Sequence, residues 1–98
     1  MKRPAPHARE AAEMLAIQAL GFIAEEPERL QSFLVATGLT VEHIRAAARE
    51  RHFLAGVLEH MLSDESLLVA FADSAGLDPA AVARAHQVLG GRWERDVP

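Results

Sequence analysis

The sequence contains no cysteine, and aromatic residues make up only 5% of its 98 residues. Without cysteine the chain has no disulfide framework, no thiolate ligand for a metal ion and no cysteine nucleophile. A disulfide-free domain fits a reducing compartment. Basic residues are also scarce, with 10 Lys and Arg against 14 Asp and Glu and a formal charge of −4. This balance argues against a chain built mainly to coat nucleic acid or anionic lipid.

Long hydrophobic runs are missing as well. The longest stretch of low polarity is residues 14–24, which is about half of what a bilayer requires. Glu10 and Glu13 precede it, whereas a secretory signal leads directly into an uncharged segment. We therefore expect no membrane association and interpret this stretch as part of a core helix. Half of the residues are apolar, which suits one small soluble domain with a single core.

Apolar residues recur at intervals of three and four, which indicates amphipathic helices, and no segment alternates as a half-buried strand does. Alanine, the strongest helix former, occurs 19 times. The sequence predicts an all-α bundle of about six short helices. Their expected ranges are residues 9–24, 27–37, 41–50, 52–62, 65–75 and 79–89.

The predicted helix ends carry recognisable capping residues. Gly38 and Gly76 each precede a leucine, the pattern of a left-handed helix cap. Thr40 and Asp78 then suit the N-caps of the following helices. The domain prediction is a flexible arm at residues 1–8, one helical domain at 9–91 and a tail at 92–98.

The first predicted helix carries apolar residues nearly all round its cylinder, so we expect it to be the most buried helix. These residues are Leu15, Ile17, Leu20, Phe22 and Ile23.

A shift of 38 residues aligns many landmarks of the two halves. Phe33 meets Phe71, Gly38 meets Gly76, and Ile44 meets Val82. Two amphipathic helices joined by a Gly-Leu turn can resemble each other without common ancestry. Either way, the sequence predicts two pseudo-repeated three-helix units that pack against one another.

The helix-Gly-Leu-helix spacing is also that of a helix-turn-helix motif, whose second helix enters the DNA major groove. In the first half this helix carries His43, Arg45 and Arg49, with the two arginines on one face. Basic charge is sparse there, so nucleic-acid binding is the alternative function and these three residues are its candidate contacts.

Residue spacings that support a metal or catalytic site are missing. No two of the five histidines have the i, i+4 spacing of a helical zinc site, and there is no HExxH motif. The serines lie in no nucleophile elbow, and the carboxylates gather at helix starts, where the helix dipole accounts for them. We predict no cofactor, no metal site and no catalytic residue.

Trp93 and Arg92 form the predicted partner-binding pair in the tail, since tryptophan and arginine are enriched in interface hot spots. Surplus apolar helix surface in so small a bundle also calls for a covering partner. We therefore expect a non-enzymatic protein-interaction module that binds another protein or forms a homodimer.

The stretch between Glu13 and Leu89 resembles a small alphaproteobacterial family of unknown function. The resemblance rests on the strings EMLAIQALGFIAEEPERLQSFLVATGL, FLAGVL and DESLLVAFADSAGLDPAAVARA. It implies a short, all-helical, cytoplasmic bacterial protein, and it supplies no activity, substrate, cofactor or site residue.

Overall fold

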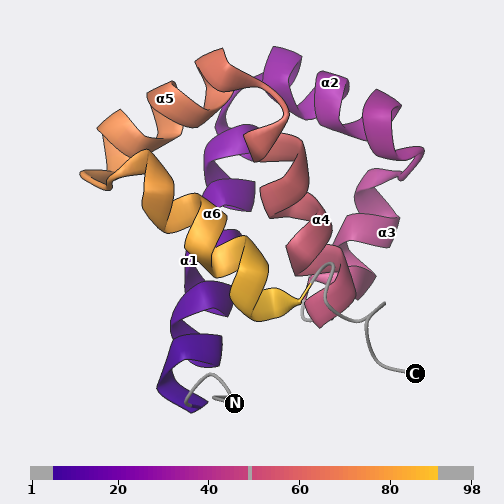
Figure 1. Ribbon diagram of the computed structural model, residues 1–98. Helices are drawn as coiled ribbons and strands as arrows, with labels where there is room; N and C mark the ends of the chain where they lie inside the picture. Colours follow the sequence, from indigo (N-terminus) through magenta and orange to yellow (C-terminus); the bar gives the residue numbers. More distant parts are fainter. Residues whose placement is uncertain (1–5, 49, 91–98) are drawn as a thin grey trace.

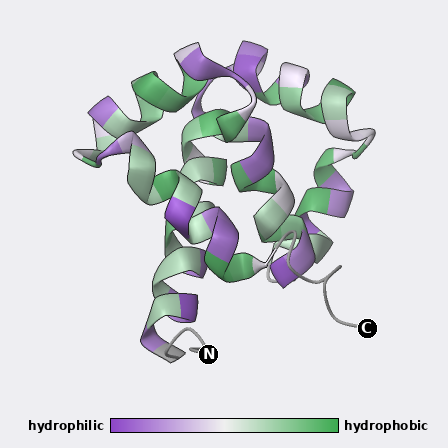
Figure 2. Cartoon of the chain, in the orientation of Figure 1, coloured by the Kyte–Doolittle hydropathy of each residue, from purple (hydrophilic) through white to green (hydrophobic). Residues whose placement is uncertain are grey.

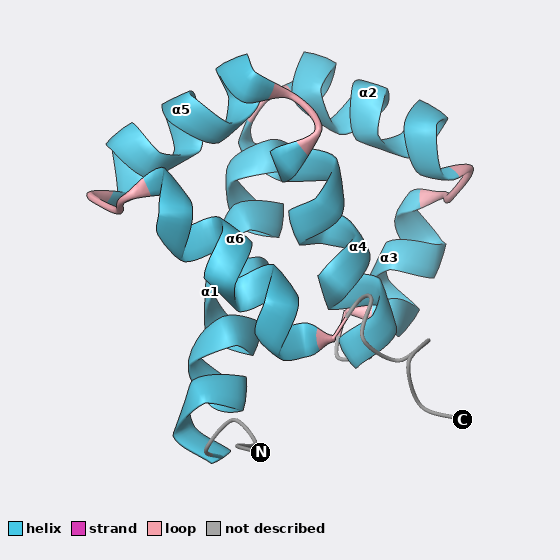
Figure 3. Ribbon diagram, in the orientation of Figure 1, coloured by secondary structure: helices cyan, strands magenta, loops and turns pink. Residues whose placement is uncertain are grey.

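The computed structural model describes residues 6–48 and 50–90, and these fold into six α-helices without a strand (Figures 1 and 3). The predicted all-α class is confirmed, and three helices begin and end where the sequence predicted. The bounds are α1 Pro6–Glu25, α2 Pro27–Thr37, α3 Val41–Ala47, α4 Arg51–Leu62, α5 Glu65–Ala75 and α6 Pro79–Leu89.

Four predicted helix ends differ from the structure, and the largest differences are at the start of α1 and the end of α3. Helix α1 begins at Pro6, so residues 6–8 belong to a helix and not to a flexible arm. A proline is tolerated in the first helical turn because its missing N–H has no partner there anyway. Helix α3 ends at Ala47 and not at residue 50, and Glu50 is already extended as the N-cap of α4. Helix α3 has no fully buried residue, so little tertiary packing favours its extension.

The two Gly-Leu turns are the left-handed caps that the sequence predicted. Gly38 has φ 74° and Gly76 has φ 70°, and the N–H of each donates back to a carbonyl of the preceding helix. The N-caps of the following helices are Thr40 and Asp78, whose side chains accept from backbone N–H groups of the first turn. Each turn is thus closed on both sides by local hydrogen bonds.

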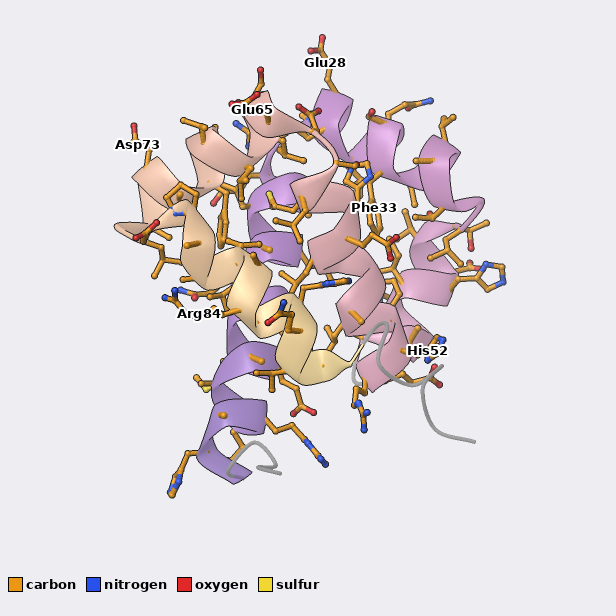
Figure 4. The ribbon with its side chains drawn as sticks, in the orientation of Figure 1. Glu28, Phe33, His52, Glu65, Asp73 and Arg84 are labelled. Carbon is orange, nitrogen blue, oxygen red and sulfur yellow. The ribbon has the colours of Figure 1, made fainter. Side chains whose placement is uncertain are left out.

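Helices α1 and α4 lie at the centre of the fold, and α6 packs across both of them (Figure 1). Helices α2 and α5 cover one end, with α3 at one side. Phe33 of α2 points into the core and is fully buried (Figure 4). The largest fully buried side chains are Phe33, Ile23, Leu54, Leu58, Met61, Leu89, Val57 and Val82.

The two halves are related by the predicted shift of 38 residues, and they pack by exchanging equivalent contacts. Phe22 of α1 contacts Phe71 of α5, with ring centroids 5.5 Å apart. His60 of α4 contacts Phe33 of α2 at 5.1 Å. Under the shift, position 22 corresponds to 60 and position 33 to 71, so each contact becomes the other when the halves are exchanged. The contact between α1 and α5 and the contact between α4 and α2 are therefore equivalent under the shift.

This equivalence does not extend to the third helix of each half. Helix α6 has 11 residues and buries Val82, Ala85 and Leu89. Its counterpart α3 has seven residues and buries none, with Ile44 only half-buried. Arg51 of α4 donates from Nε to the carbonyl oxygen of Leu89 at 3.1 Å and so ties the end of α6 to the start of α4. Helix α6 is part of the core, while α3 lies at its edge.

The buried face of α1 is built mainly from alanine. Ala12, Ala16, Ala19 and Ile23 recur at intervals of four, three and four and are almost inaccessible to solvent. Small side chains on this face let α4 and α6 approach closely. The expectation that α1 is the most buried helix was wrong, because α4 buries five of its 12 residues, whereas Ile17 of α1 is 49% exposed.

No single helix of the described residues is long and apolar enough to cross a membrane. Helices α5 and α6 meet that length and hydropathy test only as a pair, and the pair is bent by 103°.

Glycine to alanine changes at Gly76 and Gly56 should alter stability in opposite directions. Gly76 has a positive φ, where a β-carbon costs about 1–2 kcal/mol. Gly56 lies inside α4 with nothing within 4 Å of an added β-carbon, so alanine should stabilise by about 0.4–1 kcal/mol. Urea unfolding followed by circular dichroism measures both. Equal shifts of the same sign would contradict the capping role of Gly76.

Candidate interaction surface

Helix α1 carries a second apolar surface on the side opposite its buried alanine face. Glu10, Met14, Ile17, Gly21 and Glu25 follow one another at intervals of four, three, four and four, and all five are exposed. This spacing places them along one side of the helix, and we call them the outer stripe. Met14 is 67% exposed and Ile17 is 49% exposed. Among the described residues, α1 is the only helix with two large hydrophobic side chains exposed to this degree.

Apolar residues occur along all six helices, mixed with hydrophilic ones (Figure 2). Outside α1, the large exposed ones are single valines on separate helices, namely Val35, Val41 and Val69. Scattered single apolar residues are normal on a protein surface, whereas neighbouring ones on one face indicate a contact surface. The outer stripe is therefore the candidate site.

A shallow hollow of about 290 Å³ adjoins the carboxyl-terminal part of the outer stripe, between α1 and α5. The Phe22 and Phe71 rings contact each other at its base. Gln18, Glu25 and Ser74 add polar groups to its lining. The full lining is Gln18, Gly21, Phe22, Glu25, Phe71, Ser74 and Ala75. The hollow thus combines an aromatic base with a polar rim.

Arg29 of α2 fixes one side of this base. Its guanidinium carbon lies 4.0 Å from the centre of the Phe22 ring, and its Nη1 donates to the Phe22 carbonyl oxygen at 3.0 Å. Glu26 lies 3.8 Å from the same guanidinium group. A cation over an aromatic face and a bond to a helix-end carbonyl both stabilise this arrangement. Phe22 is therefore held by contacts from both α2 and α5.

Gly21 lies on the outer stripe in the interior of α1, and the fold gives no reason for a glycine there. An added β-carbon would meet nothing within 4 Å. Glycine inside a helix costs about 1 kcal/mol relative to alanine. Gly21 therefore weakens the free helix without improving any contact within the described residues. It also leaves the α1 backbone open to close approach from outside.

The predicted nucleic-acid contacts are only partly brought together. His43 and Arg45 are both exposed on α3, and Arg49 lies outside the described residues. His43 has a capping role, because its Nδ1 accepts from the Thr40 N–H at 3.3 Å and its own N–H donates to Thr40 Oγ1 at 3.2 Å. The geometry therefore explains His43 without a ligand.

The predicted partner-binding residues Arg92 and Trp93 also lie outside the described residues. In the ranges that are described, no group of three or more His, Asp or Glu side chains could hold a metal ion.

The described part of the chain is strongly acidic. Of the 14 acidic residues, only two lie outside the described ranges, whereas five of the 10 basic residues do. Glu28, Glu65 and Asp73 point away from the body on α2 and α5 (Figure 4). The basic residues outside are Lys2, Arg3, Arg49, Arg92 and Arg95.

The sequence periodicity does not indicate Met14 and Gly21 as surface residues, and it assigns Ile17 to the core. The available signal was the alanine spacing, because Ala12, Ala16 and Ala19 mark a face of small residues. The hollow had no such signal, since Phe22 and Phe71 meet only through the packing of the two halves.

Fold and surface together define a small all-α domain with an apolar stripe on the outside of a central helix. The chain belongs to the family described as Protein of unknown function (DUF3572), which matches residues 9–92. No curated protein and no solved structure matches it.

We expect the protein to show no detectable affinity for random-sequence duplex DNA at about 50 mM salt, because an acidic body repels the phosphate backbone. Fluorescence anisotropy with a labelled duplex measures this. Saturable binding that weakens steeply with salt and is lost in Arg45→Ala would contradict the expectation and favour the helix-turn-helix alternative.

Proposed function

We propose that this domain is a non-enzymatic protein-interaction module that binds its partner through the outer stripe of α1 and the adjoining hollow. The observation that carries the proposal is the pairing of two exposed apolar side chains, Met14 and Ile17, with a hollow whose base is aromatic. Burying such apolar surface against a partner is favourable by about 25 cal/mol per Å². A hollow beside it gives an anchor side chain somewhere to insert.

Preorganisation of the surface supports the proposal. Ala12, Ala16 and Ala19 hold α1 against the core on the opposite side, so the outer stripe sits on a fixed helix. Phe22 is held between Phe71 and Arg29. A surface that does not have to be ordered on binding loses less conformational entropy.

The rim of the surface supplies polar partners. Glu10 and Glu25 lie at the two ends of the outer stripe, and Gln18 and Ser74 line the hollow. An apolar centre with a polar rim is the usual anatomy of a protein interface.

We further propose a bacterial cytoplasmic setting, which the absence of cysteine favours. Arg92 and Trp93 remain predicted partner contacts.

Site-specific photo-crosslinking in the native host tests the proposal. A benzophenone amino acid at Ile17 should give protein adducts, whereas the same group at Val41 on α3 should not. Val41 is a matched control because it is 51% exposed, against 49% for Ile17. Equal adduct yields from both positions, or none from Ile17 in a folded protein, would contradict the proposed interface.

A further inference from the structure

We propose that the occupant of this surface is a second copy of the same chain, docked with two-fold symmetry so that Met14 of each copy enters the hollow beside Gly21 of the other. The inference rests on the proposed function, because it names the partner of that same surface.

The protruding side chain and the hollow lie on one row of α1. Met14, Gln18, Gly21 and Glu25 follow at intervals of four, three and four, and the last three line the hollow. Met14 is thus two helical turns, about 10 Å, from Gly21. Helix α1 therefore carries both the protruding Met14 side chain and part of the hollow that could receive a methionine.

In a two-fold symmetric dimer, the Met14 side chain and the hollow of each copy are both used. The two-fold axis lies in the interface between the copies, perpendicular to α1 and level with the midpoint between Ile17 and Gln18. The two α1 helices are then antiparallel. Met14 then faces the hollow of the second copy, and its own hollow receives the second copy's methionine. Such an isologous contact is the commonest form of homodimer.

This arrangement explains why position 21 is a glycine. Its missing side chain leaves the α1 backbone open, and nothing within 4 Å in the same chain uses that space. A methionine is unbranched and flexible, so it can follow the shape of a shallow hollow over a bare backbone. The residue that weakens the free helix is the one that the docked side chain requires.

The surrounding surface is open to a second copy. The amino-terminal end of α1 extends beyond the other helices (Figure 1), and Met14 further along the same helix is 67% exposed. A standard interface of about 800 Å² per partner would cover roughly an eighth of the 6595 Å² surface.

Charge sets the salt dependence of this association. Each copy has a formal charge of −4, and the antiparallel docking brings Glu10 toward Glu25 of the other copy. Salt screens this repulsion, so self-association should strengthen as salt rises. Binding of a basic partner or of nucleic acid would weaken instead.

Cysteine pairing tests the docking directly, because the natural chain has no cysteine. Met14→Cys and Gly21→Cys proteins are mixed and oxidised mildly. The mixed disulfide should form much faster than in a control mixture of Met14→Cys with Gly56→Cys. Gly56 is the matched control, an exposed glycine inside α4 that also has nothing within 4 Å of an added β-carbon. Equal rates in the two mixtures, with all variants folded by circular dichroism, would overturn the proposal.

Sedimentation equilibrium of the full chain gives a second measurement. Gly21→Gln should raise the dimer Kd about tenfold by filling the hollow, and Gly56→Gln should leave it unchanged. A monomer at every concentration and salt, together with Ile17 adducts to a different protein, would overturn self-association while supporting the proposed interface. A monomer without any Ile17 adduct would overturn both.

Discussion

The packing of an alanine face of α1 against α4 and α6 is the contact on which the rest of the structure depends. Ala12, Ala16 and Ala19 are nearly inaccessible to solvent, and Ile23 completes their stripe. Small side chains let the central helices approach, and they leave the larger side chains of α4 to fill the space. The same choice turns the large residues Met14 and Ile17 outward.

The two central helices differ in side-chain size at equivalent positions. At one pair of positions related by the 38-residue shift, α1 has Ala16 where α4 has Leu54, and both residues are buried. The relation reverses one residue later, where Ile17 of α1 is half-exposed and Ala55 of α4 is buried. Small side chains on α1 and large side chains on α4 let the two central helices pack together. The reversal gives α1 alone an apolar outer surface.

Local signals explain why so much of the fold could be predicted from the sequence. Gly38, Gly76, Thr40 and Asp78 act through hydrogen bonds to residues two to four positions away, so their effects can be predicted without knowledge of the tertiary structure. The end of α3 could not be read in this way, because its length depends on how little it packs against the core.

The candidate site was harder to predict, because periodicity alone cannot say which side of an evenly apolar helix is buried. Ile17 and its neighbour Ala16 both suit a core, and tertiary packing selects the alanine. The hollow also depends on the meeting of the two halves at Phe22 and Phe71. Only the alanine spacing in α1 pointed toward the outer stripe, by elimination.

The fold depends on α1 directing its small residues toward the core and its large residues Met14 and Ile17 toward solvent. Equilibrium unfolding of Ala16→Leu and Ile17→Ala, at a protein concentration low enough to keep the chain monomeric, tests it most directly. We predict that Ala16→Leu lowers the free energy of unfolding by about 1–3 kcal/mol through overpacking. We predict that Ile17→Ala changes it by less than about 0.5 kcal/mol, as for an exposed position. A loss of about 2–5 kcal/mol for Ile17→Ala, the cost of emptying a core site, with little effect of Ala16→Leu, would contradict the account.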